Sequence, residues 1–248
     1  MSDLTLLATM GAALVIGGLI GSVGIGGVLL APWLVQVVGL GVRDAIAISM
    51  ASFIATGLVA LVLFVHSGGD LVRDRRGHII ATMPGAFLGA LALAVTPERL
   101  CLFLLAAFLI ATGLRVLFGS NATARMSDET DRASDWLVGA AAGFASALTG
   151  TGGPMVLVPI LVWRGTPLLT AIALGQLAQR PVASVATIGN AVSGGVDLVT
   201  GALVGVMLAP GVLLGRRVAE AMPLVIVARS VAVLLIGTGL WLALKAIM

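Results

Sequence analysis

Charged side chains are missing from long stretches of this chain. None occurs between Leu4 and Val42, and charged residues make up 10% of the 248 residues against 59% hydrophobic. Soluble proteins carry about 25% charged residues, and a soluble globule of this size could not bury so much apolar surface. The sequence therefore predicts an integral membrane protein. We expect an all-α fold, because helices satisfy their backbone hydrogen bonds internally and no strand-like alternation is present.

The apolar runs divide the chain into spanning segments. After the first uncharged stretch they cover about 45–66, 78–95, 100–118, 136–163, 168–192, 198–215 and 224–244. A full crossing needs ~20 residues, so the stretches 4–42 and 136–163 are too long for one helix. Each is interrupted by glycines and is predicted to form one helix followed by a shorter one. The polytopic fold then has eight to ten spanning or half-spanning helices.

The two halves of the chain are homologous. A shift of 126 residues aligns 21–122 with 147–248 without a gap and gives 23 identities in 102 positions. This is about twice what composition alone would give, and fixed-period similarity indicates internal duplication. We divide the chain into a first repeat (1–122), a linker (123–134) and a second repeat (135–248), which together form one transmembrane domain.

The arginines indicate how the repeats are oriented. If each half crosses five times, one side receives Arg73, Arg75, Arg76, Arg115, Arg125, Arg132, Arg164, Arg216, Arg217 and Arg229. The other side receives only Arg43, Arg99 and Lys245, and such an asymmetry is typical of membrane proteins. Five crossings make the repeats inverted, as in many secondary transporters. Re-entrant half-helices at about 27–40 and 154–163 would instead give four crossings and parallel repeats.

The glycine-rich breaks are the first candidate substrate site. The first break holds Gly24, Gly26 and Gly27 and leads to Pro32, and the second holds Gly150, Thr151, Gly152 and Gly153 and leads to Pro154 and Pro159. A half-helix that starts at such a break directs N–H groups and a positive dipole end at an anion. Two of them near the midplane would form an anion site with little fixed charge. The alternative is close helix packing by small residues.

Arg180 is the second candidate. It lies about 18 Å into the run 168–192, too deep to reach the interface easily, and an intramembrane cation is costly without a partner or cavity. Gln176 and Gln179 precede it and Pro181 predicts a kink after it. We expect these polar residues to bind an anion; the alternative is an arginine that binds helix carbonyls. The weaker polar candidates Ser49, Ser52, Thr149 and Asn190 are expected to form interhelical hydrogen bonds.

Several other functions are disfavoured by the sequence. All eleven carboxylates lie in or near predicted loops or helix ends, so no buried proton relay is evident. We find no catalytic constellation, no P-loop, no metal-ligand cluster and no basic stripe for nucleic acid. We expect no enzyme activity, no cofactor and no metal.

The chain resembles the TauE/SafE family of sulfite exporters. The resemblance covers essentially the whole chain and is strongest in Gly24-Ile-Gly-Gly-Val-Leu-Leu-Ala-Pro32 and Gly150-Thr-Gly-Gly-Pro-Met-Val-Leu-Val-Pro159. The family pattern often has another glycine where this chain has Val28 and Pro154. The resemblance implies transport of small sulfur-containing anions, such as sulfite, sulfonates or sulfoacetate, across the bacterial inner membrane.

The leading hypothesis is a secondary transporter for such an anion. The alternatives are an anion channel, or a carrier for another small anion such as a carboxylate. The expected partners are the anion and the lipid bilayer, and small-residue helix faces would permit a homodimer.

Overall fold

The structure is a computed structural model that describes residues 3–23, 26–118, 132–164, 166, 168–221 and 224–247. The first half contains α1 (Asp3–Val23), η1 (Gly26–Leu29), α2 (Leu30–Trp33), η2 (Leu34–Val38), α3 (Val42–Val95) and α4 (Glu98–Phe118). The second half contains α5 (Arg132–Thr149), α6 (Pro154–Trp163), α7 (Leu168–Val192), α8 (Leu198–Ala221) and α9 (Leu224–Ile247). Every regular element in the described residues is helical, which confirms the all-α prediction. Most of the expected linker, 123–131, lies outside the described residues.

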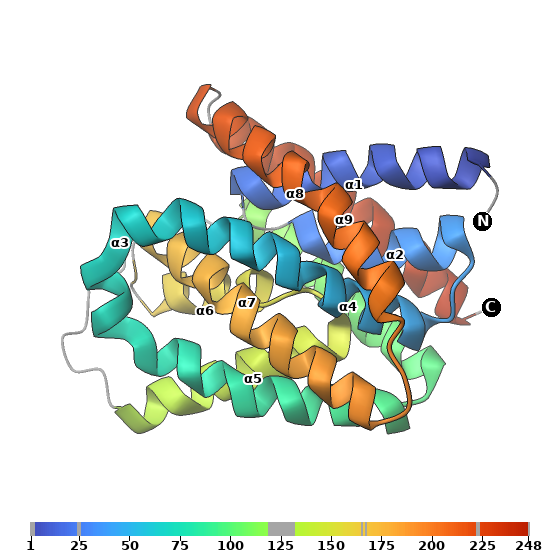
Figure 1. Cartoon of the computed structure of the whole chain (residues 1–248), viewed down its shortest axis with the longest axis horizontal. Coiled ribbons are helices and arrows are strands. Elements are labelled where there is room, and N and C mark those ends of the chain that lie inside the picture. Colours follow the sequence, from blue (N-terminus) through green and yellow to red (C-terminus); the bar gives the residue numbers. More distant parts are fainter. Residues whose placement is uncertain are drawn as a thin grey trace.

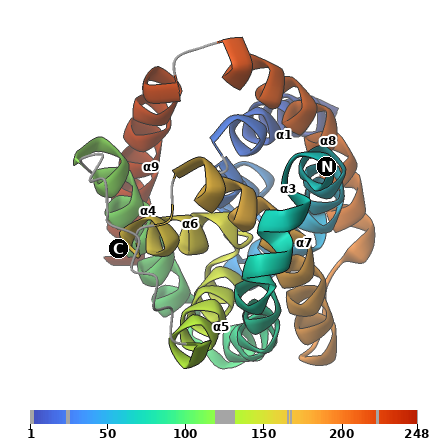
Figure 2. The ribbon, with the colours of Figure 1, turned by 90° about the vertical axis from the view of Figure 1, so that its left-hand side faces the viewer.

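The helices pack side by side, mostly along the longest axis of the molecule (Figures 1 and 2). The long α3 packs against α5, α7 and α8, α1 packs against α8, and α4 packs against α9. Among the described residues, two helical stretches are long and apolar enough to cross a bilayer by length and composition, Val42–Val62 and Leu198–Arg217. Large apolar side chains are also exposed on the outside of the bundle, such as Val62, Val206 and Leu137. An apolar exterior of this kind suits contact with lipid.

Both halves contain the interruption that the glycines predict. In the first half α1 ends at Val23 and the irregular series from η1 to η2 begins at Gly26. In the second half α5 ends at Thr149 and α6 begins at Pro154. Figure 1 shows that each short segment runs back along the helix before it, so each break is a helical hairpin. A methyl group built on Gly26 would lie 2.6 Å from the Ile16 carbonyl oxygen, so η1 packs directly on α1.

One sequence prediction about the first half was wrong. The segment between 66 and 78 was expected to be a loop, but the backbone is helical throughout α3. Figure 1 shows that α3 bends sharply and that its second arm runs back below the first, with α7 between them. The tripeptide Ser67-Gly-Gly69 therefore lies within helix, whereas the equivalent Ser193-Gly-Gly195 forms the turn between α7 and α8.

One physical cause of the difference lies two residues after the tripeptide, at Asp197. Asp197 caps α8, because its carboxylate accepts hydrogen bonds from the backbone N–H and the hydroxyl of Thr200. These bonds lower the pKa of the Asp197 carboxyl. An N-cap of this type favours a new helix start. The equivalent position in the first half is Leu71, which has no side-chain acceptor.

Contacts between the two halves occur in equivalent pairs. A methyl group built on Gly17 would lie 2.2 Å from the Leu208 carbonyl oxygen, and one built on Gly143 would lie 2.0 Å from that of Thr82. At the repeat shift of 126 residues, Gly143 is the equivalent of Gly17 and Leu208 is the equivalent of Thr82, so the two contacts correspond to each other. The same relation links α4 and α9, where Gly113 faces Ala232 and Gly239 faces Ala106. Each half thus packs its small residues against backbone of the other half, and the repeat of 126 residues is present in the contacts as well as in the sequence.

Candidate functional site

The two glycine breaks meet inside the bundle. A methyl group built on Gly27 would lie 3.4 Å from the Thr151 carbonyl oxygen and 3.0 Å from Cζ of Phe53. One built on Gly152 would lie 2.7 Å from Cδ2 of the same ring. Phe53 is fully buried. The first break, the second break and the Phe53 ring therefore form one closely packed group, which we call the junction.

The second break needs glycine for its backbone conformation. Gly150, Gly152 and Gly153 have φ angles of 68°, 78° and 93°, which are costly for residues with a Cβ atom. The loop is fixed at its start, where the Thr151 N–H donates to the Ser146 carbonyl at 3.1 Å. Pro154 begins α6, a position where its missing N–H costs little. Close packing and backbone geometry therefore both require these glycines.

The start of α6 has fewer free donors than the sequence predicts. The N–H groups of Val156 and Leu157 both donate to the Gly153 carbonyl, at 3.3 and 3.0 Å. The helix dipole still directs its positive end at the junction. An anion at this point would gain more from that dipole and from nearby hydroxyls than from a full set of backbone N–H groups.

Gln176 and Gln179 connect the halves at the junction. The Gln176 side chain donates from Nε2 to the Ile20 carbonyl at 2.9 Å, and Gln179 donates from Nε2 to the Thr56 hydroxyl at 2.8 Å. Both glutamines are buried, and the Oε1 atom of each has no hydrogen-bond partner. Buried polar atoms without a partner cost about 1–3 kcal/mol each. Two such acceptor atoms beside an irregular backbone remain available to a hydrogen-bond donor.

Arg180 lies next to the junction but does not enter it. Its backbone packs on Gly57, where an added methyl group would lie 2.8 Å from Cα of Arg180. Its side chain is exposed and forms no hydrogen bond or ion pair with any described residue. Pro181 follows within α7 and cannot donate to the Leu177 carbonyl. The structure thus places the arginine at the crossing of α3 and α7, with its charge directed away from the packed core.

The remaining predicted residues have varied positions. Pro32 is buried in α2, Pro159 lies within α6, and Gly24 lies outside the described residues. The hydroxyls of Ser49, Ser52 and Thr149 donate to carbonyls of their own helices. The expectation that these three would form interhelical bonds was therefore wrong, because a helical carbonyl three or four residues back is always within reach.

Sequence reasoning missed Phe53 in the junction and two residues beside it, Thr56 and Gly57. One signal could have found Phe53, because it stands 126 residues before Gln179 and so holds the equivalent place in the first half. Both residues also lie against the second glycine of a Gly-Gly pair, Phe53 through its ring on Gly27 and Gln179 through its backbone on Gly153. Thr56 and Gly57 carry no such signal, because small and hydroxyl residues are common along the whole chain.

Comparison with known proteins identifies a family match for this chain. A family model described as "Sulfite exporter TauE/SafE" matches residues 71–242, which include the second break and all of α7. The comparison with curated proteins and the comparison with solved structures give no match.

Proposed function

Since the chain belongs to the TauE/SafE sulfite exporter family, whose members are multi-pass membrane transporters and not enzymes, we propose that it carries a small sulfur-containing anion across the bacterial inner membrane. Sulfite, a sulfonate and sulfoacetate are the proposed substrates. The observation that carries the proposal is the junction itself. Two broken helices, one from each half, meet there, and buried glutamines bond across the halves.

We further propose that the repeats are inverted. In the described residues each half contains five segments if the two arms of α3 and each break segment are counted separately. Figure 1 shows that successive segments run back and forth along the long axis. The first turns of α1 and the last turns of α9 accordingly lie at the same end of the molecule. An odd number of segments turns the second half over relative to the first. Five crossings in each half also place ten arginines on one side of the membrane, and that side would face the cytoplasm.

Alternating access would act on the contacts described above. Rocking of one half against the other changes the distances between Gly27 and Thr151 and between Gln179 and Thr56, which now close the centre. Their opening would release the glutamine amides and hydroxyls as ligands for an oxyanion. Arg180 lies at the same depth and would supply positive potential beside the opened path. A site with one full charge holds an anion without trapping it.

Flux in proteoliposomes tests the proposal. We expect saturable uptake with counterflow for at least one of sulfite, sulfoacetate and a simple alkanesulfonate, and less for sulfate, thiosulfate and acetate. Arg180→Ala is expected to abolish flux while the protein inserts and purifies normally, and Arg180→Lys to restore part of it because the charge returns. Unchanged flux in the alanine variant would refute the role of Arg180. Transport of acetate alone would show a carboxylate carrier, and flux without saturation or counterflow would show an anion channel.

A further inference from the structure

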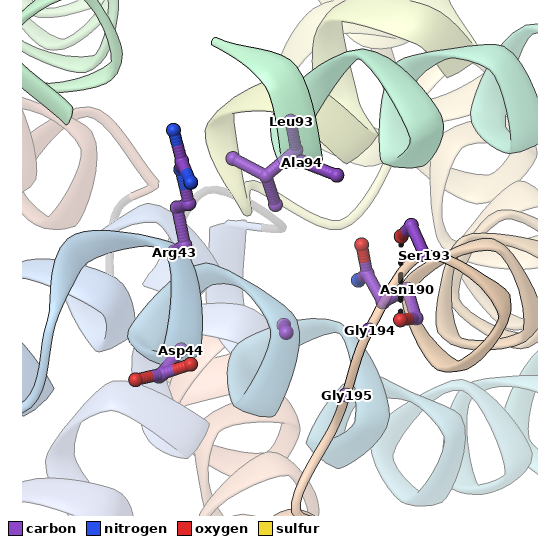
Figure 3. Close-up of a pocket in the computed structure, with 9 residues that line it drawn as sticks. Arg43, Asp44, Leu93, Ala94, Asn190, Ser193, Gly194 and Gly195 are labelled. Atoms are coloured by element: carbon purple, nitrogen blue, oxygen red, sulfur yellow. Dashed lines mark hydrogen bonds between the residues drawn. The ribbon is translucent and has the colours of Figure 1, made fainter. Parts of the chain in front are cut away.

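A second polar space lies at one end of the bundle, away from the junction. It is a cavity of about 190 Å³ where the start of α3, the end of α3 and the C-terminus of α7 come together. Its polar lining comes from Arg43, Asp44, Asn190 and Ser193. Figure 3 shows Arg43 and Asn190 on opposite sides of the space, with Leu93 and Ala94 above it. Asn190 follows Gln179 by eleven residues, or about 16 Å along a helix, so the two places are distinct.

Asn190 is the residue that indicates a ligand. Its side chain is 4% exposed, its Nδ2 atom has no hydrogen-bond partner, and its amide bonds to no described residue. Burial of a polar group without a partner costs about 1–3 kcal/mol. Because neither amide atom is held by the polypeptide, a half-turn of the group would present its NH2 to the cavity and place Oδ1 where Nδ2 now lies. An acceptor bound in the cavity would then bond to this NH2 group.

Arg43 supplies fixed positive charge to the same cavity. Its Nε and Nη2 donate to the Thr96 carbonyl at 3.2 and 2.6 Å, and this anchors the guanidinium. A guanidinium has five N–H donors, so others remain for a ligand. Asp44 is exposed, and Figure 3 shows its carboxylate directed away from Asn190. The Ser193 hydroxyl donates to the Gly189 carbonyl at 2.8 Å and is not a free donor.

We propose that this cavity is a second anion-binding site, which takes one small oxyanion between Arg43 and Asn190. An anchored guanidinium, an unpaired amide and an apolar wall suit a charged oxygen head with a short or absent apolar tail. The space is large enough for sulfite, sulfoacetate or a short carboxylate. The site lies at the end of the bundle that carries few arginines, where an anion would wait before or after it passes the junction. The role of the cavity in transport rests on the proposed function, whereas anion binding in the cavity does not.

Chemical modification inside the cavity tests the site. Ala94 lines the cavity and Cys101 is the chain's single cysteine, so Ala94→Cys in a Cys101→Ala background reports on this place alone. The rate of reaction with a sulfonate-bearing thiol reagent is measured in detergent with and without sulfite, sulfoacetate or acetate. We expect at least one anion to slow the reaction fivefold or more.

The isosteric variant Asn190→Asp is the decisive control, because it keeps the shape and replaces a donor by a negative charge. We expect it to abolish protection by the anion, while Gln179→Leu, which alters the junction, leaves protection intact. Absence of protection by all three anions, or protection that survives Asn190→Asp, would overturn the second site. Protection without transport of any anion would contradict the proposed function instead, so the two failures are distinguishable.

Discussion

Gly152→Ala is the most direct test of the junction, because the chain provides a matched control. Gly152 and Gly39 share a φ angle of 78°, so alanine at either position incurs the same backbone penalty of about 1–2 kcal/mol. An added methyl group on Gly152 would lie 2.7 Å from Cδ2 of Phe53, whereas one on Gly39 has no atom within 4 Å. The difference between the two variants therefore measures the close packing of the junction.

The size of that difference follows from the geometry. Ordinary Cβ contacts begin near 3.4 Å, so the loop or the ring must shift by about 0.7 Å, and the buried ring of Phe53 has little room to do so. Overpacking of this kind costs about 1–3 kcal/mol. For a chain of this length each kcal/mol lowers Tm by about 2–4 °C. We expect Gly152→Ala to unfold about 2–12 °C below Gly39→Ala in detergent.

A second substitution identifies the cause. Phe53→Leu removes ring atoms that the new methyl group meets, so it should destabilise the Gly152→Ala protein less than it destabilises the native one. Tryptophan fluorescence during heating gives the Tm of the native protein, of Gly152→Ala, Gly39→Ala and Phe53→Leu, and of the variant that combines Gly152→Ala with Phe53→Leu. Equal Tm values for Gly152→Ala and Gly39→Ala, or strictly additive effects of Gly152→Ala and Phe53→Leu, would refute the close contact between the breaks.

Three further predictions concern the packing, the bonds between halves and the response to acid. Gly143→Ala should lower Tm by several degrees, because overpacking against a backbone carbonyl costs about 1–3 kcal/mol, while Gly11→Ala, which meets no atom within 4 Å, should be neutral or slightly stabilising. Gln179→Leu and Thr56→Val should each lower the free energy of unfolding by about 1–3 kcal/mol. The double variant should lose less than the sum of the two single losses, because both partners of the same hydrogen bond are then removed together. Because the pKa of Asp197 is lowered, its contribution to stability is complete above the ordinary pKa of Asp and is lost as the pH falls through the lowered value. Asp197→Asn should therefore remove this acid-sensitive step from a plot of Tm against pH.

Much of the fold follows from the sequence, because its strongest signals are local. Long uncharged runs specify helices, and three glycines in four residues, as at Gly150–Gly153, specify where a helix stops. The bend of α3 could not be predicted, because Ser67-Gly-Gly69 and Ser193-Gly-Gly195 are identical, and the second is followed by a helix cap at Asp197. The tripeptide alone does not decide between helix and turn; residues that follow it contribute.

The site was predictable only in part, for a related reason. Glycine positions reveal that two backbones approach closely but not which ones, and the meeting of Gly27 with Thr151 depends on tertiary packing. The orientation of Arg180 was equally hidden. Its sequence neighbour Gln179 is buried while Arg180 is exposed, since adjacent residues on a helix point about 100° apart.

The two halves differ most where they would need to differ for directional transport. Phe53 and Gln179 are equivalent in the repeat and both pack on the second glycine of a Gly-Gly pair, at Gly27 and Gly153. Phe53 makes this contact with its ring, whereas Gln179 makes it with its backbone and directs its side-chain amide to the Thr56 hydroxyl. Arg180 adds to this contrast, because its equivalent is Ile54. A duplicated scaffold with identical centres would bind an anion equally from both directions. Under the proposed function we therefore expect the ring on one side and the polar groups on the other to give the two approaches to the junction different affinities for an anion.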